Sequence, residues 1–137
     1  MVTASLIVLA ALASQPSTRT TPTEILTTCY FNDAKVDATL LHHVVDVTSR
    51  VASVDRDGIG GYIVRLEIQF QSAELTARSS VLCYFDGTSR DALARIRMGR
   101  EVTIRGVVRK IDDDSRRYVD PNVQVTMKGC ELVGGAE

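Results

Sequence analysis

The sequence lacks tryptophan and contains only two histidines, three prolines and three cysteines in 137 residues. It has no P-loop, no glycine-rich dinucleotide motif and no pattern typical of a Ser-His-Asp triad. The three cysteines do not have the spacing of zinc ligands. These absences predict a protein that is not an enzyme and that needs no metal and no cofactor.

Hydrophobic and charged residues are present in ordinary proportions. Hydrophobic residues make up 45% of the chain and charged residues 24%, and the formal net charge at pH 7 is −1. These values are typical of one soluble globular domain. A domain of this length buries roughly two thirds of the surface that its unfolded chain exposes, so it can form a hydrophobic core.

The N-terminal segment is apolar and uncharged. Ala4 to Ala13 form a ten-residue apolar run, and the first charged residue is Arg19. A helix needs about 20 apolar residues to cross a bilayer, so this run is too short for an integral membrane span. It has the length of a signal-peptide core and ends in the small residues of a cleavage site. We therefore predict a signal peptide over residues 1–13, a flexible spacer over 14–22 and a folded domain over 23–137, exported to the periplasm or cell envelope and soluble after cleavage.

Hydrophobic periodicity divides the rest of the chain into two helices and five strands. A spacing near 3.6 predicts a helix over 23–41 and a short helix over 89–98, which Gly99 ends. Alternating or continuous apolar runs predict five strands, over residues 43–54, 62–70, 81–85, 100–111 and 123–132. The first strand is expected to contain a bulge, Gly106 to allow a kink, and the last strand to change register at Lys128 and Gly129.

The order of these elements predicts the fold class. A helix, three strands, a second helix and two strands is the order of an OB-fold. We therefore predict a mainly β domain, a five-stranded Greek-key barrel with an N-terminal helix and a short helix between the third and fourth strands. An open β-sandwich is the alternative, although a sandwich of this size normally has about seven strands.

Several short stretches, taken in their order along the chain, resemble one known family. They are residues 29–38 (CYFNDAKVDA), 45–47 (VDV), 81–85 (VLCYF), 98–106 (MGREVTIRG) and 130–132 (CEL). In this order and spacing they resemble the bacterial tRNA-anti-like family of small exported OB-fold proteins, over most of residues 27–133. The resemblance implies an OB-fold and a likeness to anticodon-binding domains.

Two of the three cysteines are expected to lie on neighbouring strands. Cys83 belongs to the predicted third strand and Cys130 to the fifth, and these strands are neighbours in an OB barrel. An oxidising compartment allows a disulfide between them if their Cα atoms lie within about 7 Å. The alternative is two reduced thiols in the core. Cys29 is expected to pack its helix on the barrel, since the sequence places no base beside it.

Positive charge is concentrated in residues 88–117, which contain nine basic and five acidic residues. Arg65 and Tyr84 are expected on the outer face of the middle strands, where OB-folds bind ligands, and Arg105 is the third candidate binding residue. A pI of about 6.1 and the lack of tryptophan weigh against nucleic acid. An ordinary solvated face is the alternative for the basic segment.

Two acidic stretches and the histidine pair are expected to be structural. Residues 55–58 (DRDG) and 112–114 (DDD) lack the alternating ligands and closing glutamate of a calcium loop, so they are predicted to be solvated turns. His42 and His43 would point to opposite faces of a strand. Neither pattern predicts a metal site.

Two functional hypotheses remain at the level of sequence. The first is a non-enzymatic binding module whose partner is a protein or an anionic polymer, such as an oligonucleotide or a glycan. The second is a structural or regulatory envelope protein that acts by strand pairing or oligomerisation. A cysteine-dependent enzyme is disfavoured because no base is placed beside a thiol.

Overall fold

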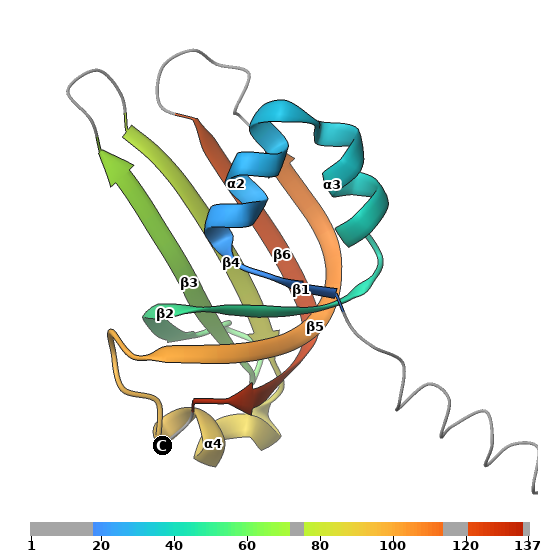
Figure 1. The fold of residues 1–137 in the computed structure, drawn as a ribbon. Coiled ribbons are helices and arrows are strands. Elements are labelled where there is room, and N and C mark those ends of the chain that lie inside the picture. Colours follow the sequence, from blue (N-terminus) through green and yellow to red (C-terminus); the bar gives the residue numbers. More distant parts are fainter. Residues whose placement is uncertain (1–17, 72–75, 114–120, 136–137) are drawn as a thin grey trace, which may run out of the picture.

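The computed structural model describes residues 18–71, 76–113 and 121–135 (Figure 1). The predicted signal peptide and the first four residues of the predicted spacer lie outside the described residues. The elements in chain order are β1 (Thr18–Thr20), α2 (Pro22–Phe31), α3 (Asp33–Leu40), β2 (Val44–Arg56), β3 (Tyr62–Gln71), β4 (Thr76–Phe85), the 3-10 turn η1 (Gly87–Ser89), α4 (Arg90–Ala94), β5 (Glu101–Asp113) and β6 (Asn122–Gly134). The domain is mainly β, as predicted.

The strands form one six-stranded sheet in the order β1-β2-β3-β4-β6-β5. A further pairing joins β5 to β2, so the hydrogen-bonded ladders from β2 to β6 return to their starting strand. β4 and β6 pair in parallel, and all other pairings among these five strands are antiparallel. Counted from β2, the third strand therefore lies beside the fifth, as the sequence predicted.

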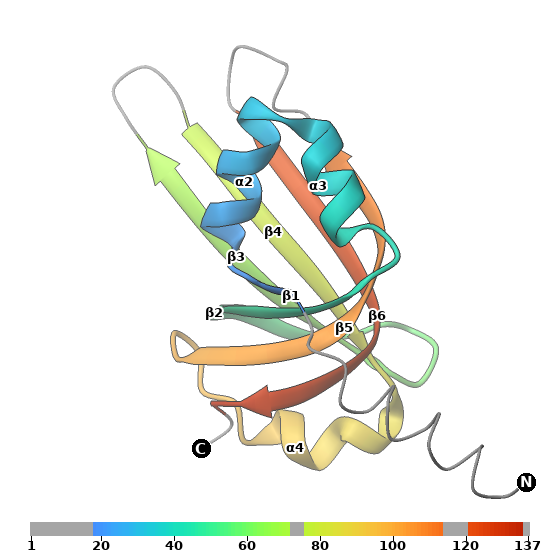
Figure 2. The same cartoon turned by 45° about the vertical axis from the view of Figure 1, so that its right-hand side comes forward.

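The helices α2 and α3 lie together over the sheet near one end of the molecule, and α4 lies at the opposite end (Figures 1 and 2). The single helix predicted over 23–41 is two helices, because Asn32 interrupts it. The backbone N–H of Asn32 donates to the Thr28 carbonyl and ends α2. The Asn32 side chain accepts a hydrogen bond from the Lys35 N–H and begins α3. No helix in the described ranges is both long and apolar enough to span a membrane.

The core lies between the helices and the inner face of the strands. Alternate strand residues point inward, as the period of two requires. The most deeply buried side chains come from α2, α3 and all five long strands, and include Ile25, Val36, Val45, Val47, Val64, Leu66, Val81, Val102, Ile104, Val108, Val123 and Met127. Val and Ile dominate the strand positions, which fits their preference for packed, pleated surfaces.

The structure corrects several predicted boundaries. The residues that the structure describes form six strands rather than five, because Thr18–Thr20 pairs in parallel with β2 inside the segment predicted as a flexible spacer. β4 begins at Thr76 rather than at residue 81, since its polar first half pairs with β3 despite lacking apolar alternation. β5 extends through Asp113, which the sequence placed in a solvated turn. In each case backbone pairing extends into segments whose side chains gave no strand signal.

The predicted irregularities of the strands are present. The β2–β3 register shifts between Val51 and Ser53, and the β5–β6 register shifts around Gly106. Gly129 has a φ of 61°, a conformation that favours glycine. Before it, the buried side chains of β6 lie at odd-numbered positions up to Met127, and after it the next buried side chain is that of Cys130. These interruptions re-aim the strands where the sheet curls.

Replacing Gly106 with alanine is expected to destabilise the fold. A Cβ built there would lie 2.7 Å from Cys130 Sγ, closer than packed atoms approach, and 3.1 Å from the Lys128 carbonyl oxygen, which is a tight contact. Overpacking of this kind costs about 1–3 kcal/mol. Gly134→Ala is the matched control, because the first atom its Cβ would meet is Thr103 Cβ at 3.9 Å. Urea denaturation should show a loss for Gly106→Ala alone, and equal stabilities would contradict the close packing.

Candidate functional site

The outer face of three adjacent strands carries two of the predicted binding residues. We call it the outer β3–β4–β6 face. Strand register places its side chains in rows: Ile63 and Tyr84; Arg65, Leu82 and Thr126; Glu67, Ser80 and Gln124; Gln69, Arg78 and Asn122. The first row is completed by Lys128, whose ammonium group contacts the Tyr84 ring. The face thus holds three cations, one acid and one tyrosine, in a chain whose net charge is −1.

Tyr84 is the aromatic centre of this face. Lys128 Nζ lies 3.4 Å from the centroid of its ring, which is a cation–π contact. Arg65 is exposed and stands diagonally across from Tyr84 on β3. Arg65 and Tyr84 are predicted from the sequence, whereas Lys128 is not, because the change of register after Met127 hides which side of β6 it occupies.

Hydrogen bonds fix the side chains in the two rows that contain Glu67 and Gln69. The Ser80 hydroxyl donates to Glu67 Oε1 at 2.9 Å, and Arg78 Nη2 donates to Gln69 Oε1 at 3.3 Å. Arg78 Nε lies 3.9 Å from Glu67 Oε1. Glu67 is therefore held by side chains of β4. The two rows that contain Tyr84 and Arg65 carry positive charge without an acidic side chain.

The loop between β2 and β3 borders the Tyr84 end of the face. Asp57 Oδ1 accepts the N–H groups of Ile59 and Gly61 at 2.8 and 2.9 Å. These hydrogen bonds lower the pKa of Asp57, and the charge of Lys128 contributes in the same direction. A pocket of about 360 Å³ opens here, and it is lined by Arg56, Gly58, Gly60, Gly61 and Tyr62.

Arg105, the third predicted binding residue, lies elsewhere. Its partner on β2 is Asp46, whereas the β2 partner of Arg65 is Ser53. Asp46 and Ser53 are seven positions apart on β2, which corresponds to about 23 Å along an extended strand. Arg65 and Tyr84 therefore share a face, and Arg105 does not belong to it.

Arg105 is bound to a buried carboxylate. Its Nε and Nη2 donate to the two oxygens of Asp46 at 2.8 and 3.1 Å, and the Asp46 side chain is only 6% exposed. These hydrogen bonds raise the pKa of Arg105 further above its usual value. Arg19 on β1 and Glu131 on β6 are the next register partners, so charges alternate in sign across four strands. The guanidinium of Arg105 therefore links β5 to the neighbouring strands β2 and β6.

Cys83 and Cys130 lie on neighbouring strands, as predicted, and both are free and buried. A hydrogen bond between the two thiols, together with burial, raises the pKa of Cys83. The disulfide between them and its alternative, two reduced thiols in the core, both stay predictions.

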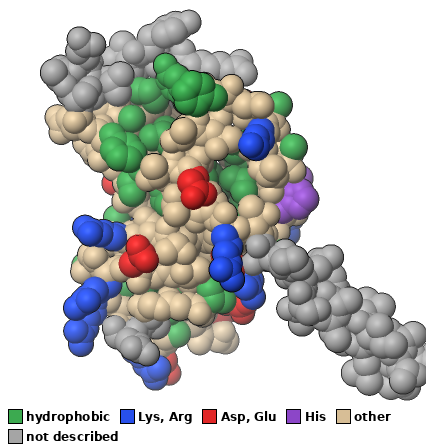
Figure 3. Space-filling model, viewed as in Figure 1, with side chains coloured by type: hydrophobic (Ala, Val, Ile, Leu, Met, Phe, Trp, Pro, Cys, Tyr) green, Lys and Arg blue, Asp and Glu red, His purple; other side chains and the backbone are tan. Residues whose placement is uncertain are grey.

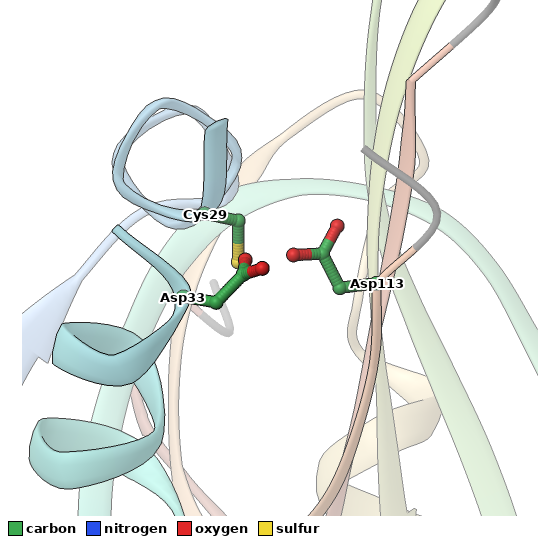
Figure 4. Close-up of side chains that lie close together, drawn as sticks. All are labelled: Cys29, Asp33 and Asp113. Atoms are coloured by element: carbon green, nitrogen blue, oxygen red, sulfur yellow. The ribbon is translucent and has the colours of Figure 1, made fainter. Parts of the chain in front are cut away.

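Cys29 lies next to two carboxylates that the sequence did not associate with it. Its thiol and the side chains of Asp33 and Asp113 point toward one another (Figure 4), and their ligand atoms all lie within 4.8 Å of one another. Burial, then Asp113 and Asp33, raise the pKa of the Cys29 thiol to about 12. No sequence signal connects these positions, because Asp113 comes from β5, about 80 residues along the chain.

The side of the molecule with the helices has its own division of charge. Most of its lysine and arginine side chains gather over the half that contains β2, β5 and α4, and hydrophobic side chains lie around α2 (Figure 3). The arginines of the predicted basic segment that lie near α4, Arg90, Arg95, Arg97 and Arg100, are exposed. They carry no aromatic partner comparable to Tyr84 among the described residues.

Comparison with known proteins shows a shared fold. No family model and no curated protein matches the chain. A lipoprotein of Klebsiella pneumoniae, provisionally described as nucleic acid-binding, is 17% identical, with a TM-score of 0.56 over 91% of this chain and 97% of its own. A small single-stranded DNA-binding protein of Mycoplasma pneumoniae is 9% identical, with a TM-score of 0.39 over 66% of this chain and 91% of its own. The first likeness shows the fold and nothing about function.

Replacing Arg105 with methionine is expected to destabilise the protein more than Arg109→Met, its control on the same strand. The buried Asp46 carboxylate would lose both hydrogen bonds of the guanidinium, and breaking one side of a buried pair is costly. The double variant Asp46→Leu/Arg105→Met should regain part of the loss, because the buried charge is gone. Urea denaturation measures all three, and equal effects of Arg105→Met and Arg109→Met would show that the pair is not structural.

Proposed function

We propose that this chain is an OB-fold binding module that takes a single-stranded oligonucleotide on its outer β3–β4–β6 face and catalyses no reaction. The observation that carries the proposal is the arrangement of side chains at the Tyr84 end of that face. There, Tyr84 lies on the middle strand, with Lys128 against its ring and Arg65 diagonally across from it on β3. Proteins that bind single-stranded nucleic acid without strong sequence preference combine a positively charged surface with aromatic side chains on which bases stack.

The contact between Lys128 and Tyr84 is weak enough to yield to a base. An exposed cation–π contact contributes about 0.5–1 kcal/mol. Stacking of one base on an aromatic side chain contributes about 1–3 kcal/mol. A base that displaces Lys128 from the ring therefore gains free energy, and the released ammonium group stays close enough to meet the phosphate that follows. Arg65 offers a second phosphate contact from the other side.

The family and location belong to the same proposal. We infer that the chain is a tRNA-anti-like protein of the cell envelope, exported by the apolar segment at residues 4–13. The fold shared with the Klebsiella lipoprotein supports this inference, and that protein's name also refers to nucleic acid. An oligonucleotide partner in the envelope is therefore the ligand class to test first.

Tyr84→Ala is expected to weaken oligonucleotide binding about tenfold or more, because it removes the stacking surface. Fluorescence anisotropy with a labelled oligothymidylate at low ionic strength measures the dissociation constant. Arg65→Ala and Lys128→Ala should each weaken binding and reduce the dependence of log affinity on log salt by about 0.7.

Lys35→Ala is the matched control, because Lys35 is an exposed cation on α3, on the helical side of the sheet. It should leave the dissociation constant unchanged, and circular dichroism should show that every variant is folded. Absence of binding by the intact protein at low salt, or equal losses for Lys35→Ala and Lys128→Ala, would refute the proposed site. Binding of a sulfated glycan in place of the oligonucleotide would refute the ligand class.

A further inference from the structure

Three elements that are distant in sequence bring a thiol and two carboxylates to one place. Cys29 lies near the end of α2, Asp33 is the first residue of α3, and Asp113 is the last residue of β5. Their sulfur and oxygen atoms lie within 4.8 Å of one another and point inward (Figure 4). This cluster, which we call the Cys29 cluster, is separate from the outer β3–β4–β6 face.

A cavity of about 290 Å³ coincides with the Cys29 cluster. Its lining consists of Cys29, Asp33, Val36, Asp37, Ile111 and Asp113. Cys29 is only 3% exposed, whereas Asp33 and Asp113 are half-buried, so the thiol forms the inner side of the cavity. The convergence of donors and the space between them are two independent features of the same place.

The electrostatics of the cavity favour a cation. The side chains of Asp33, Asp37 and Asp113 line the cavity together with the Cys29 thiol, so three carboxyl groups surround the sulfur. A bound cation favours the thiolate form of Cys29, since a coordinated thiol loses its proton outright. Calcium and magnesium take oxygen ligands, whereas a thiolate selects softer ions such as zinc.

We propose that Cys29, Asp33 and Asp113 bind a divalent transition-metal ion of the zinc class, which ties the α2–α3 junction to the end of β5. Zinc lies about 2.3 Å from sulfur and about 2.1 Å from carboxylate oxygen, so tetrahedral ligand atoms are about 3.5 Å apart. The three ligand atoms, which lie within 4.8 Å of one another, need to close by at most about 1.3 Å, which side-chain rotation supplies. The fourth position faces the cavity and takes water.

Binding follows a simple balance of charge. The S–H bond of Cys29 breaks, a sulfur–metal bond forms, and the proton passes to the buffer, with no transfer of electrons. The ion then sits among one thiolate and two carboxylates. Because the unfolded chain does not bring these groups together, the metal stabilises the folded state.

Cobalt(II) tests the site, because it replaces zinc and absorbs in the near ultraviolet when a thiolate binds it. The full chain, reduced with a phosphine, is titrated with Co²⁺ and then with Zn²⁺. One equivalent of Co²⁺ should give the thiolate charge-transfer band, and Zn²⁺ should remove it. Cys29→Ser should abolish the band, and Asp33→Asn or Asp113→Asn should weaken Co²⁺ affinity at least about tenfold.

Two control variants separate this site from other binding. Asp112→Asn makes the same change one residue away, where the carboxylate lies 3.6 Å from Lys110 Nζ, and should leave Co²⁺ affinity unchanged. Cys83→Ala removes one of the two other thiols and should leave the band in place. Zn²⁺ should raise the thermal midpoint of the parent chain and of Asp112→Asn, but not of Asp113→Asn. Absence of the band, or a band that survives Cys29→Ser, would overturn the proposal.

Discussion

The shape of the domain depends on one strand that has two sets of partners. The first half of β2 pairs with β5 over Val44–Arg50, and its second half pairs with β3 over Val51–Arg56. The change of partner coincides with the register shift after Val51. By pairing with β5 along one half and with β3 along the other, β2 joins the two ends of the sheet. The hydrogen bond between the Thr48 and Thr103 hydroxyls and the ion pair of Asp46 reinforce the closing ladder.

This closure divides the molecule into surfaces with different roles. Inward positions of all five long strands are used by the core, so functional groups lie on the outer faces or under the helices. On the β2–β5 side, Asp46 holds Arg105 and the charges neutralise one another across the strands. On the outer β3–β4–β6 face, Glu67 is the single acid, and the cations near Tyr84 are available to a ligand. The Cys29 cluster lies under the helices, where β5 ends.

Periodicity was sufficient to predict the strands with apolar alternation, the neighbouring positions of Cys83 and Cys130, and the shared face of Arg65 and Tyr84. It could not predict β1, because three polar residues pair only through their backbone. It grouped Arg105 with Arg65, since alternation gives the side of a strand but not the place around a closed ring. The approach of Asp113 to Cys29 depends on how the helices pack, and local sequence does not encode that distance.

A nuclear magnetic resonance titration tests the central claim most directly. The ¹⁵N-labelled protein is titrated with a short oligothymidylate at low ionic strength, and the backbone amide shifts are followed residue by residue. Our account predicts that the largest changes fall on β3, β4 and β6 around Arg65, Tyr84 and Lys128, and on the β2–β3 loop. Changes that centre on Arg19, Asp46 and Arg105, or no changes at all, would contradict it.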